Sequence, residues 1–270
     1  MDGRESASAD SPVWDRDALR DPHRQQDKPQ RVQAMFDAIA PTYERINSLA
    51  TFGRDAVWRR RAVVAAEVRP GDVVLDVACG TGDMLRVFAR LRPLPGRLIG
   101  VDFATRMLTH GRYDRLPVPV EIIQADALHL PLPDESADVI SCAFGVRNFQ
   151  DLHAGLREMY RVARPGARVV ILEFALPTNR LLRRLYAWYC AGVLPWLGRL
   201  VARDRTGAYE YLCRSVETFP PPEALVTALR QVGFADVRVQ AMNFGGVVLY
   251  RARKGNQDDA APGGRDSISP

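Results

Sequence analysis

The residues best suited to chemistry begin in the stretch Asp76–Asp83, which follows a short apolar run. Gly80 and Gly82 bracket Thr81, so the backbone can turn sharply there and approach a ligand closely. The apolar run predicts a buried parallel strand before the turn, and the helical spacing that begins at Met84 predicts a helix after it. A strand, a glycine-rich loop and a helix in this order are typical of nucleotide-binding sites.

The loop lacks the features that hold a phosphate. A dinucleotide fingerprint that began at Gly80 would need a third glycine where the chain has Leu85, and no P-loop lysine follows. Asp83 would lie at the helix N-terminus, where its charge repels a phosphate. S-adenosylmethionine has no phosphate, and its ammonium and sulfonium groups favour nearby acids such as Asp76. The loop therefore favours S-adenosylmethionine as the cofactor over a glycine-rich turn without a ligand.

Acids also stand where the next two apolar runs end. Asp102 ends the run that starts at Arg97, 26 residues after Asp76, and a carboxylate there can accept hydrogen bonds from both ribose hydroxyls. Asp126 follows the run Val120–Gln124, where an adenine amino group can be recognised. A helix-capping acid and a turn acid are the alternative interpretations of these two residues.

The elements that must position these residues alternate along the chain. We expect strands over residues 73–77, 97–101, 120–124, 137–143 and 168–174, separated by helices that include 84–92 and 151–163. Ligand-type residues at the carboxyl ends of successive strands predict an α/β fold with a doubly wound parallel sheet. We expect a helix over 222–232 and strands over 237–240 and 247–251 to close the domain.

The ends of the chain differ in composition from its middle. Residues 1–30 are polar without a sustained apolar period, and residues 255–270 are rich in Gly, Asp, Pro and Ser, so we expect disorder in both. A single domain over 31–254 lies between them. An apolar stripe over Val32–Ile39 predicts a helix, and a second helix runs through Trp58. These helices precede the first strand and can cover the cofactor or substrate, or serve only as a packing arm.

Residues 180–200 interrupt the alternation and form the most apolar stretch of the chain, within an apolar insertion over 178–218. Arg183, Arg184 and Arg199 argue against a membrane-spanning helix. The insertion is therefore either a lid packed on the core or a surface that meets a membrane or an apolar substrate.

Composition limits the possible classes of protein. With 270 residues and 47% hydrophobic content, the chain can bury one full core. The four cysteines contain no C-x-x-C pair and the histidines do not cluster near them, which indicates reduced thiols, no metal site and a cytoplasmic protein. No signal-peptide pattern opens the chain. A net charge of +5 and a pI of about 9.2 permit nucleic acid or an anionic membrane as a partner without selecting either.

Beyond the loop, the chain resembles the quinone C-methyltransferases of menaquinone and ubiquinone biosynthesis, a family within the class I methyltransferases. The resemblance runs from about Val32 to Arg253. The segments that carry it are Met35–Ala40 with Tyr43 and Asn47, Trp58–Arg60, Ala143–Asn148, Tyr160–Val162 before Arg164–Gly166, and Leu172–Phe174. It implies a seven-stranded sheet whose last strands form a hairpin. In many relatives Asn stands at position 126, and Asp126 can still accept a hydrogen bond from the adenine amino group.

The resemblance also implies cofactor contacts, residue by residue, and the loop itself adds two more. The cofactor-binding residues that we expect are Asp76, Gly80, Thr81, Asp102, Asp126 and Ala127. Many relatives carry Ser at the position of Ala143, so that residue is left out of the expected site.

A hydroquinone carbon becomes nucleophilic towards the sulfonium methyl group when a neighbouring hydroxyl loses its proton. The site therefore needs a base or a cation that stabilises the phenolate, together with alignment of the reacting atoms. Arg147 and Asn148, just past the fourth strand, are placed to bind a quinol oxygen. Arg147 is a poor base because its pKa lies above about 12, so its expected role is charge stabilisation. Tyr43 and Asp37 are the weaker catalytic candidates.

The expected activity is S-adenosylmethionine-dependent C-methylation of a prenylated quinol, foremost demethylmenaquinol to menaquinol. A benzoquinol of the ubiquinone pathway and another small aromatic substrate are alternatives. A nucleic-acid methyltransferase would carry an Asn or Asp-Pro-Pro-aromatic motif or a Pro-Cys pair, and the chain has neither. A non-enzymatic lipid or quinone binder would tolerate loss of the cofactor loop, which is intact. We expect peripheral contact with the inner face of the membrane, no nucleic-acid partner and no metal, and leave open whether the chain forms an oligomer.

Overall fold

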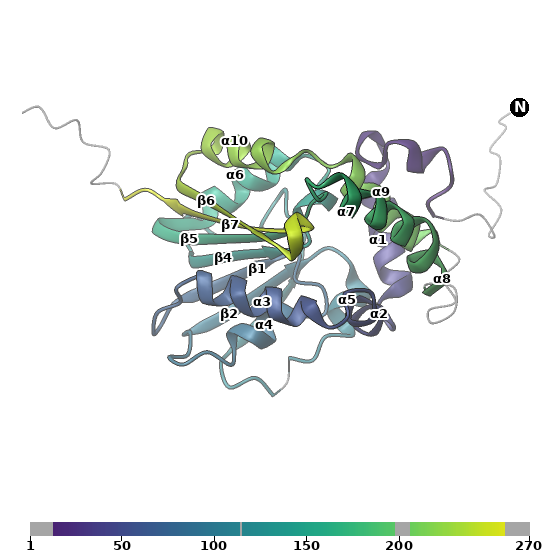
Figure 1. Cartoon of the computed structure of the whole chain (residues 1–270). Coiled ribbons are helices and arrows are strands. Elements are labelled where there is room, and N and C mark those ends of the chain that lie inside the picture. The colour runs from purple at the N-terminus through teal and green to yellow at the C-terminus, as the bar shows by residue number, and fades with distance from the viewer. Residues whose placement is uncertain (1–12, 114, 198–205, 257–270) are drawn as a thin grey trace, which may run out of the picture.

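The structure is a computed structural model and describes residues 13–113, 115–197 and 206–256. Its centre is a seven-stranded sheet in the order β3-β2-β1-β4-β5-β7-β6 (Figure 1). The strands are β1 (Val73–Val77), β2 (Arg97–Asp102), β3 (Val120–Gln124), β4 (Ala137–Ala143), β5 (Ala163–Phe174), β6 (Phe234–Met242) and β7 (Val247–Lys254). Strands β1 to β5 are parallel, and β7 is antiparallel to both of its neighbours. The expected doubly wound sheet with a closing hairpin is confirmed.

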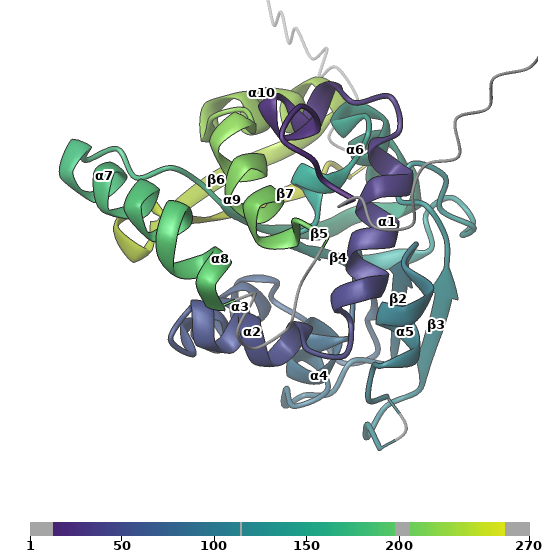
Figure 2. The same ribbon diagram turned by 90° about the vertical axis from the view of Figure 1, so that its right-hand side faces the viewer.

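Helices cover both faces of the sheet and the carboxyl ends of its parallel strands. They are α1 (Lys28–Ile39), α2 (Tyr43–Ala50), α3 (Arg54–Ala65), α4 (Asp83–Phe88), α5 (Thr105–Thr109), α6 (Leu152–Val162), α7 (Arg180–Trp188), α8 (Leu194–Leu197), α9 (Ala208–Thr218) and α10 (Pro222–Val232). Helices α3 and α4 lie on one face, and α6 and α10 lie on the other (Figure 1). Helices α1, α2, α7, α8 and α9 gather at the strand ends (Figure 2).

The core consists of an apolar layer on each face of the sheet. Successive side chains of a strand point to opposite faces, so Val74 of β1 packs in the layer beneath α3 and α4 and Leu75 packs in the layer beneath α6 and α10. Because both faces of β1 are covered, its sequence reads as a nearly continuous apolar run. The one acid in that run, Asp76, is buried with it.

Three helices rather than two precede the first strand. Helix α3, which carries Trp58, packs on the face of the sheet, and its first half also reaches the strand ends, where Asp55 and Arg59 line a pocket described below. Helix α4 ends at Phe88 rather than near Arg92, because the N–H groups of Arg90 and Leu91 bond to carbonyls three residues back. Strand β5 begins at Ala163 because a bulge lets the segment before Arg168 continue pairing with β4.

The N-terminal segment differs from the expected disordered arm over the part that the structure describes. Residues 13–27 contain two short 3₁₀ turns and lie against α9 and α1. Trp14 is 2% exposed and stacks on Tyr211 with ring centroids 4.2 Å apart. Trp14, Ala18 and Pro22 are the buried residues of this segment, too few to produce a sustained apolar period, so the sequence did not reveal this packing. Residues 1–12 and 257–270 lie outside the described residues.

The apolar insertion is part surface and part core. Helix α7 has no buried residue, whereas Cys190 and Leu194 are buried. Cys190 and Cys213 are joined by a disulfide, so the expectation of four reduced thiols is wrong for this pair. The two cysteines are 23 residues apart in sequence, and no short motif marks them as partners. Arg199, which we expected at the edge of the insertion, lies outside the described residues.

Candidate active site

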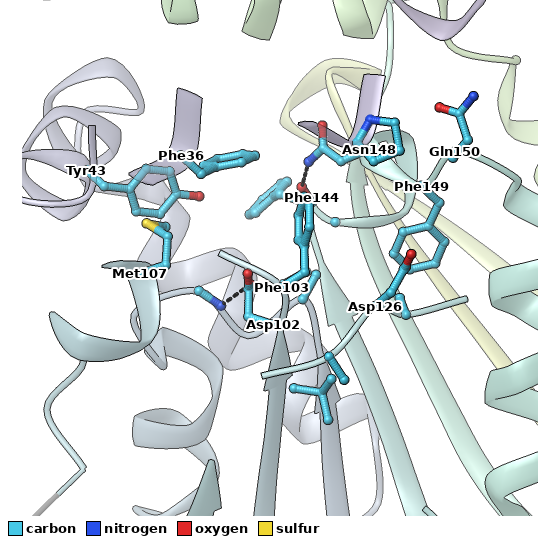
Figure 3. A pocket seen from close by; sticks show the side chains of 18 residues that line it. Phe36, Tyr43, Asp102, Phe103, Met107, Asp126, Phe144, Asn148, Phe149 and Gln150 are labelled. Carbon is cyan, nitrogen blue, oxygen red and sulfur yellow. Dashed lines mark hydrogen bonds between the residues drawn. The ribbon is translucent and has the colours of Figure 1, made fainter. Parts of the chain in front are cut away.

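A pocket lies where the carboxyl ends of β1, β2, β3 and β4 meet. Its volume is about 720 Å³, including the part at its mouth that is open to solvent. The strand order reverses between β1 and β4, and ligands of open α/β sheets bind at such a point. We call this the cofactor pocket. Figure 3 shows its side chains, with Tyr43 pointing in from one side and Asp126 on the other.

The backbone of the loop after β1 is shaped for close approach. Ala78, Gly80 and Gly82 have φ values of 56°, 56° and 83°, the left-handed region that glycine adopts without strain. A Cβ atom on Gly82 would collide with the ring of Tyr113, whose hydroxyl donates to the Gly80 carbonyl at 3.1 Å. Gly80 itself lines the cofactor pocket. The two glycines therefore let the loop lie tightly between the Tyr113 ring and the pocket.

Asp102 lines the cofactor pocket at the end of β2, as expected of a ribose-binding acid. Its two carboxylate oxygens accept from Gly80 N at 2.8 Å and from Ala104 N at 2.9 Å. A carboxylate offers about four lone-pair sites, so two remain for hydroxyl donors. Burial raises the pKa of Asp102 to about 6, against the opposing effect of these backbone hydrogen bonds. The group is therefore mostly ionised at neutral pH and fixed in orientation.

Asp76 and Thr81 are close to the loop but do not line the pocket. The Asp76 carboxylate accepts from Ser141 Oγ at 2.6 Å, and burial raises its pKa to about 7. Within the described residues the buried Thr81 Oγ1 has no hydrogen-bond partner. A buried hydroxyl without a partner beside a pocket fits a polar ligand group that completes its bonding.

Asp126 and Ala127 line the pocket after β3, as expected, and Asp126 also accepts from Leu128 N at 2.9 Å. Sequence reasoning missed most of the apolar wall, which consists of Phe36, Phe103, Met107, Phe144 and Phe149. Such residues carry no chemical signal in a sequence, because an apolar side chain in a pocket wall looks like one in the core.

A second pocket of about 740 Å³ lies beside the first and is largely apolar. Residues of α2, α9 and the apolar insertion form most of its walls, and α3 adds Asp55 and Arg59. Tyr43 and Phe144 line both pockets. We call this second space the acceptor pocket. A molecule in it would meet a molecule in the cofactor pocket at these two side chains.

Arg147 lines the acceptor pocket but is 3% exposed and held by the protein's own acceptors. Its Nη1 donates to Glu173 Oε1 at 2.8 Å and to the Phe144 carbonyl at 2.5 Å, and its Nε donates to Ser215 Oγ at 3.3 Å. Among the described residues no acceptor bonds to Nη2. The guanidinium is thus a fixed positive charge with one nitrogen left to meet a ligand.

Asn148 and Tyr43 line the cofactor pocket, and Tyr43 also lines the acceptor pocket. Asn148 Oδ1 accepts from the Tyr211 hydroxyl at 2.9 Å, which fixes the amide. Burial raises the pKa of Tyr43, so its hydroxyl keeps its proton at neutral pH and can donate a hydrogen bond. Asp37 lines neither pocket, because its carboxylate accepts from Arg106 N at 2.7 Å. The structure therefore removes Asp37 from the catalytic candidates.

Sequence reasoning also missed Lys28, which holds the turn that carries Arg147 and Asn148. Its ammonium is 1% exposed and donates to the carbonyls of Arg147 at 3.1 Å and Phe149 at 2.5 Å. Burial, aided by the charge of Arg147, lowers the pKa of Lys28 to about 8. A lysine in a polar N-terminal segment gives no hint of such a contact, because the partners are backbone atoms far along the chain.

Comparison with known proteins decides the family. A model of the ubiE/COQ5 methyltransferase family matches residues 24–254, most of the chain. The chain belongs to this family. It is 42% identical to the demethylmenaquinone methyltransferase of Thermus thermophilus over 218 residues, 80% of this chain and 98% of that protein. It is 40% identical to the ubiquinone/menaquinone biosynthesis C-methyltransferase UbiE of Geobacter sulfurreducens over 240 residues, 86% of this chain and 92% of that protein.

Solved structures agree on the fold of this family member. The SAM-dependent methyltransferase of Aquifex aeolicus matches with a TM-score of 0.54 and 19% identity over 78% of this chain and 97% of that one. The [4+2]-cyclase SpnF matches with a TM-score of 0.59 and 16% identity over 84% and 97%. Since a cyclase shares the fold, activity follows from the family and not from the fold alone. The protein is an S-adenosylmethionine-dependent methyltransferase.

Proposed function

We propose that this enzyme transfers a methyl group from S-adenosylmethionine to a ring carbon of a prenylated quinol, foremost demethylmenaquinol, to give menaquinol. The observation that carries the proposal is the junction of the two pockets at Tyr43 and Phe144. One pocket ends in acids suited to a nucleoside, and the other is apolar with a guanidinium suited to an aromatic ring that bears oxygen. A methyl donor and an aromatic acceptor would meet at that junction.

The residues of the cofactor pocket fit S-adenosylmethionine. Asp102 has two lone-pair sites free for the ribose hydroxyls, and Asp126 can accept from the adenine amino group. The unpartnered Thr81 Oγ1 is buried outside the pocket lining and would bond the amino-acid group only after the loop adjusts. Asp76, which its pKa of about 7 leaves partly ionised at neutral pH, would favour the positive charge of the cofactor in its ionised form, and Gly80 and Ala127 admit the ligand at the backbone. When bound, the cofactor supplies an electrophilic methyl group on a sulfonium.

The chain's own residues would activate and align the acceptor ring. Arg147 would stabilise a deprotonated ring hydroxyl through its fixed positive charge, and Tyr43, which lines both pockets, can donate a hydrogen bond that orients the ring. Asn148 lines the cofactor pocket and would act at the junction, on the side of the methyl donor. Phe144 and Phe174 stack with centroids 4.3 Å apart and offer the acceptor pocket an aromatic surface. The apolar walls exclude water from the reacting carbon.

We propose that an apolar route along Tyr189 leads from the acceptor pocket to the surface. Tyr189 lines the acceptor pocket and also a surface hollow formed with Leu49, Phe52 and Val193. Phe52 of this hollow is 84% exposed, and Trp188, which precedes Tyr189 in the chain, is 64% exposed. The tail of a prenylated quinol can follow this route while the ring stays inside. We propose that this surface, with α7 and α8, meets the inner face of the membrane and that the enzyme is otherwise cytoplasmic.

Arginines of α7 flank the exposed apolar side chains. Arg180, Arg183 and Arg184 are exposed and would attract anionic lipid headgroups. No helix within the described residues is long and apolar enough to cross a bilayer. Peripheral contact would therefore be the way in which the enzyme reaches a substrate dissolved in lipid.

Product analysis with matched substrates tests the proposal. The purified enzyme, S-adenosylmethionine and either demethylmenaquinol or the demethylated benzoquinol are incubated anaerobically, with a simple catechol as control. We expect methylation of the naphthoquinol at the higher kcat/KM. Preference for the benzoquinol would move the enzyme to the ubiquinone pathway, and a preference for the catechol would overturn the quinol proposal.

A further inference from the structure

The disulfide between Cys190 and Cys213 lies in the wall of the acceptor pocket. Cys190 belongs to the π-helical turn Tyr189–Val193 and Cys213 to α9, and both line the pocket together with Arg147. Their Cα atoms are 5.7 Å apart, within the range of ordinary disulfides, so the backbone can hold the pair without rearrangement. A ring bound in the acceptor pocket would therefore lie against a wall that contains these two cysteines.

The other two cysteines have a different environment. Cys79 and Cys142 are free thiols buried against the sheet, and neither lines the cofactor pocket or the acceptor pocket. Cys190 and Cys213 are also buried as residues, at 7% and 6% exposed, but both of them line the acceptor pocket. The chain thus has one pair of cysteines placed to meet a bound substrate and one pair placed apart from it.

The proposed reaction needs the reduced ring. A quinol has a nucleophilic ring carbon, whereas the corresponding quinone has two carbonyl groups and is an electrophile. A quinone that enters the acceptor pocket must gain two electrons and two protons before it can accept a methyl group. Two thiols that close to a disulfide release two electrons and two protons. Oxidation of the cysteine pair therefore provides the two electrons and two protons that reduction of one quinone requires.

We infer that Cys190 and Cys213 form a redox pair that reduces a quinone bound in the acceptor pocket to the quinol that is then methylated, an inference that rests on the proposed function. One thiolate adds reversibly to the electrophilic quinone. The second sulfur attacks the first, the S–S bond forms, and the electron pair of the broken S–ring bond stays with the ring. The two thiol protons end on the two quinol oxygens. A small dithiol from solution then reduces the disulfide by exchange and restores the pair.

The positive charge of Arg147 favours both reactants of this step, the cysteine thiolate and the quinone. Arg147 lines the same pocket as the two cysteines, and among the described residues no acceptor bonds to its Nη2. A nearby guanidinium favours the thiolate, which is the reactive form of cysteine. It also stabilises negative charge on a quinone oxygen as electrons arrive. The structure describes the pair in the oxidised form, the state that follows quinone reduction.

A single-turnover experiment without S-adenosylmethionine tests the inference. The enzyme is reduced with dithiothreitol, freed of reductant under nitrogen and mixed with 2,3-dimethyl-1,4-naphthoquinone. Both carbons of the quinone double bond carry methyl groups in this probe, so an adduct there cannot lose a ring hydrogen to become a stable thioether. We expect one equivalent of quinone to be reduced per chain, with a matching loss of two thiols. Quinone reduction no greater than that of a Cys190→Ser/Cys213→Ser variant would overturn the inference.

Two further variants keep the test decisive. The Cys79→Ala/Cys142→Ala variant retains the pocket pair and should reduce the quinone as the wild type does. The single Cys190→Ser variant keeps one pocket thiol, cannot close the disulfide and should lose the reduction. The shift in Tm on adding S-adenosylmethionine shows that each variant is folded. Equal quinone reduction by Cys190→Ser and the wild type would contradict a two-thiol mechanism.

The same preparation separates this inference from the proposed function. Wild-type enzyme is given S-adenosylmethionine and a demethylated quinol that has been reduced chemically beforehand. Methyl transfer without thiol-dependent quinone reduction overturns the redox pair and leaves the proposed function standing. Thiol-dependent reduction without methyl transfer overturns the proposed function and supports the redox pair alone.

Discussion

Arg147 Nη1 and Glu173 Oε1 form a hydrogen-bonded ion pair 2.8 Å long beneath the acceptor pocket, with both side chains almost fully buried. Removing one partner of a buried ion pair leaves an uncompensated charge, which is strongly destabilising. The pair therefore fixes the guanidinium in one orientation. It is this fixed charge, rather than a mobile arginine, that the proposed chemistry uses.

The first prediction concerns Arg147. Arg147→Lys keeps the charge but has no planar fork to bond Glu173, the Phe144 carbonyl and a ring oxygen at once. We expect kcat to fall about 10²-fold, comparable to the loss of one oxyanion donor, while the Kd for S-adenosylmethionine changes little. Steady-state kinetics and calorimetry measure the two quantities. As a control, Ser215→Ala removes only the partner of Nε, and a kcat near wild type is expected; a wild-type kcat in Arg147→Lys would make Arg147 structural.

The second prediction concerns Asp102 and the ribose. An alanine here would leave both Gly80 N and Ala104 N without an acceptor, whereas Asn keeps an acceptor oxygen for one of them and its size, so Asp102→Asn is the smaller change. A charge-assisted hydrogen bond is worth about 1.5–3 kcal/mol, so the Kd for S-adenosylmethionine should rise about 10–100-fold. Asp126→Asn is the matched control, because an amide oxygen still accepts from adenine and its Kd should stay near wild type. Unchanged affinity in Asp102→Asn would contradict the ribose assignment.

The third prediction is a pH dependence of cofactor binding. The Asp102 carboxyl has a pKa of about 6, raised by burial, and its charged form is the better acceptor for ribose hydroxyls. Affinity for S-adenosylmethionine should therefore weaken as pH falls below about 6, and Asp102→Asn should lose this dependence. Titrations between pH 5 and 8 follow the change. Parallel pH profiles of wild type and variant would assign the titration to another group.

The fourth prediction concerns Asp76 and stability. Burial raises its pKa from an unfolded value of about 3.9 to about 7. The folded state then binds more protons than the unfolded state in this window, so this group's contribution to stability is present below pH 4 and is lost as pH rises to 7. Asn does not titrate, so Asp76→Asn has no such pH-dependent loss. The free energy of unfolding of the variant minus that of the wild type should therefore increase by a few kcal/mol from pH 4 to pH 7. Denaturant melts at both pH values measure it, and a constant difference would contradict it.

The fifth prediction concerns the exposed apolar surface. Replacing Trp188 and Trp196 with Ser should reduce cosedimentation with anionic liposomes and activity on a long-tailed quinol, while a short-tailed analogue is still methylated. Val64→Ser changes an exposed apolar residue on α3 and serves as the control. If the tryptophan variant lost Tm together with activity on both substrates, these residues would be a packed lid and not a membrane surface.

Much of the framework could be predicted because it depends on local patterns. Strands β3 and β4 and helix α10 have the bounds that were expected from the sequence. Asp102, Asp126 and Ala127 line the cofactor pocket as expected, because the carboxyl ends of parallel strands lie at the same edge of the sheet. The acceptor pocket could not be predicted. Its walls combine α2, α9 and the insertion, and only three-dimensional packing brings Tyr43, Arg147 and the two cysteines together.

The site of methylation tests the central claim most directly. Wild-type enzyme is incubated with S-adenosylmethionine that carries an isotope-labelled methyl group and with chemically reduced demethylmenaquinol, and the product is examined by NMR. Methyl transfer to the ring places the label on carbon, next to the prenylated position, and this is the predicted spectrum. A label on a ring oxygen, or no labelled quinol at all, would contradict C-methylation of a quinol by this enzyme.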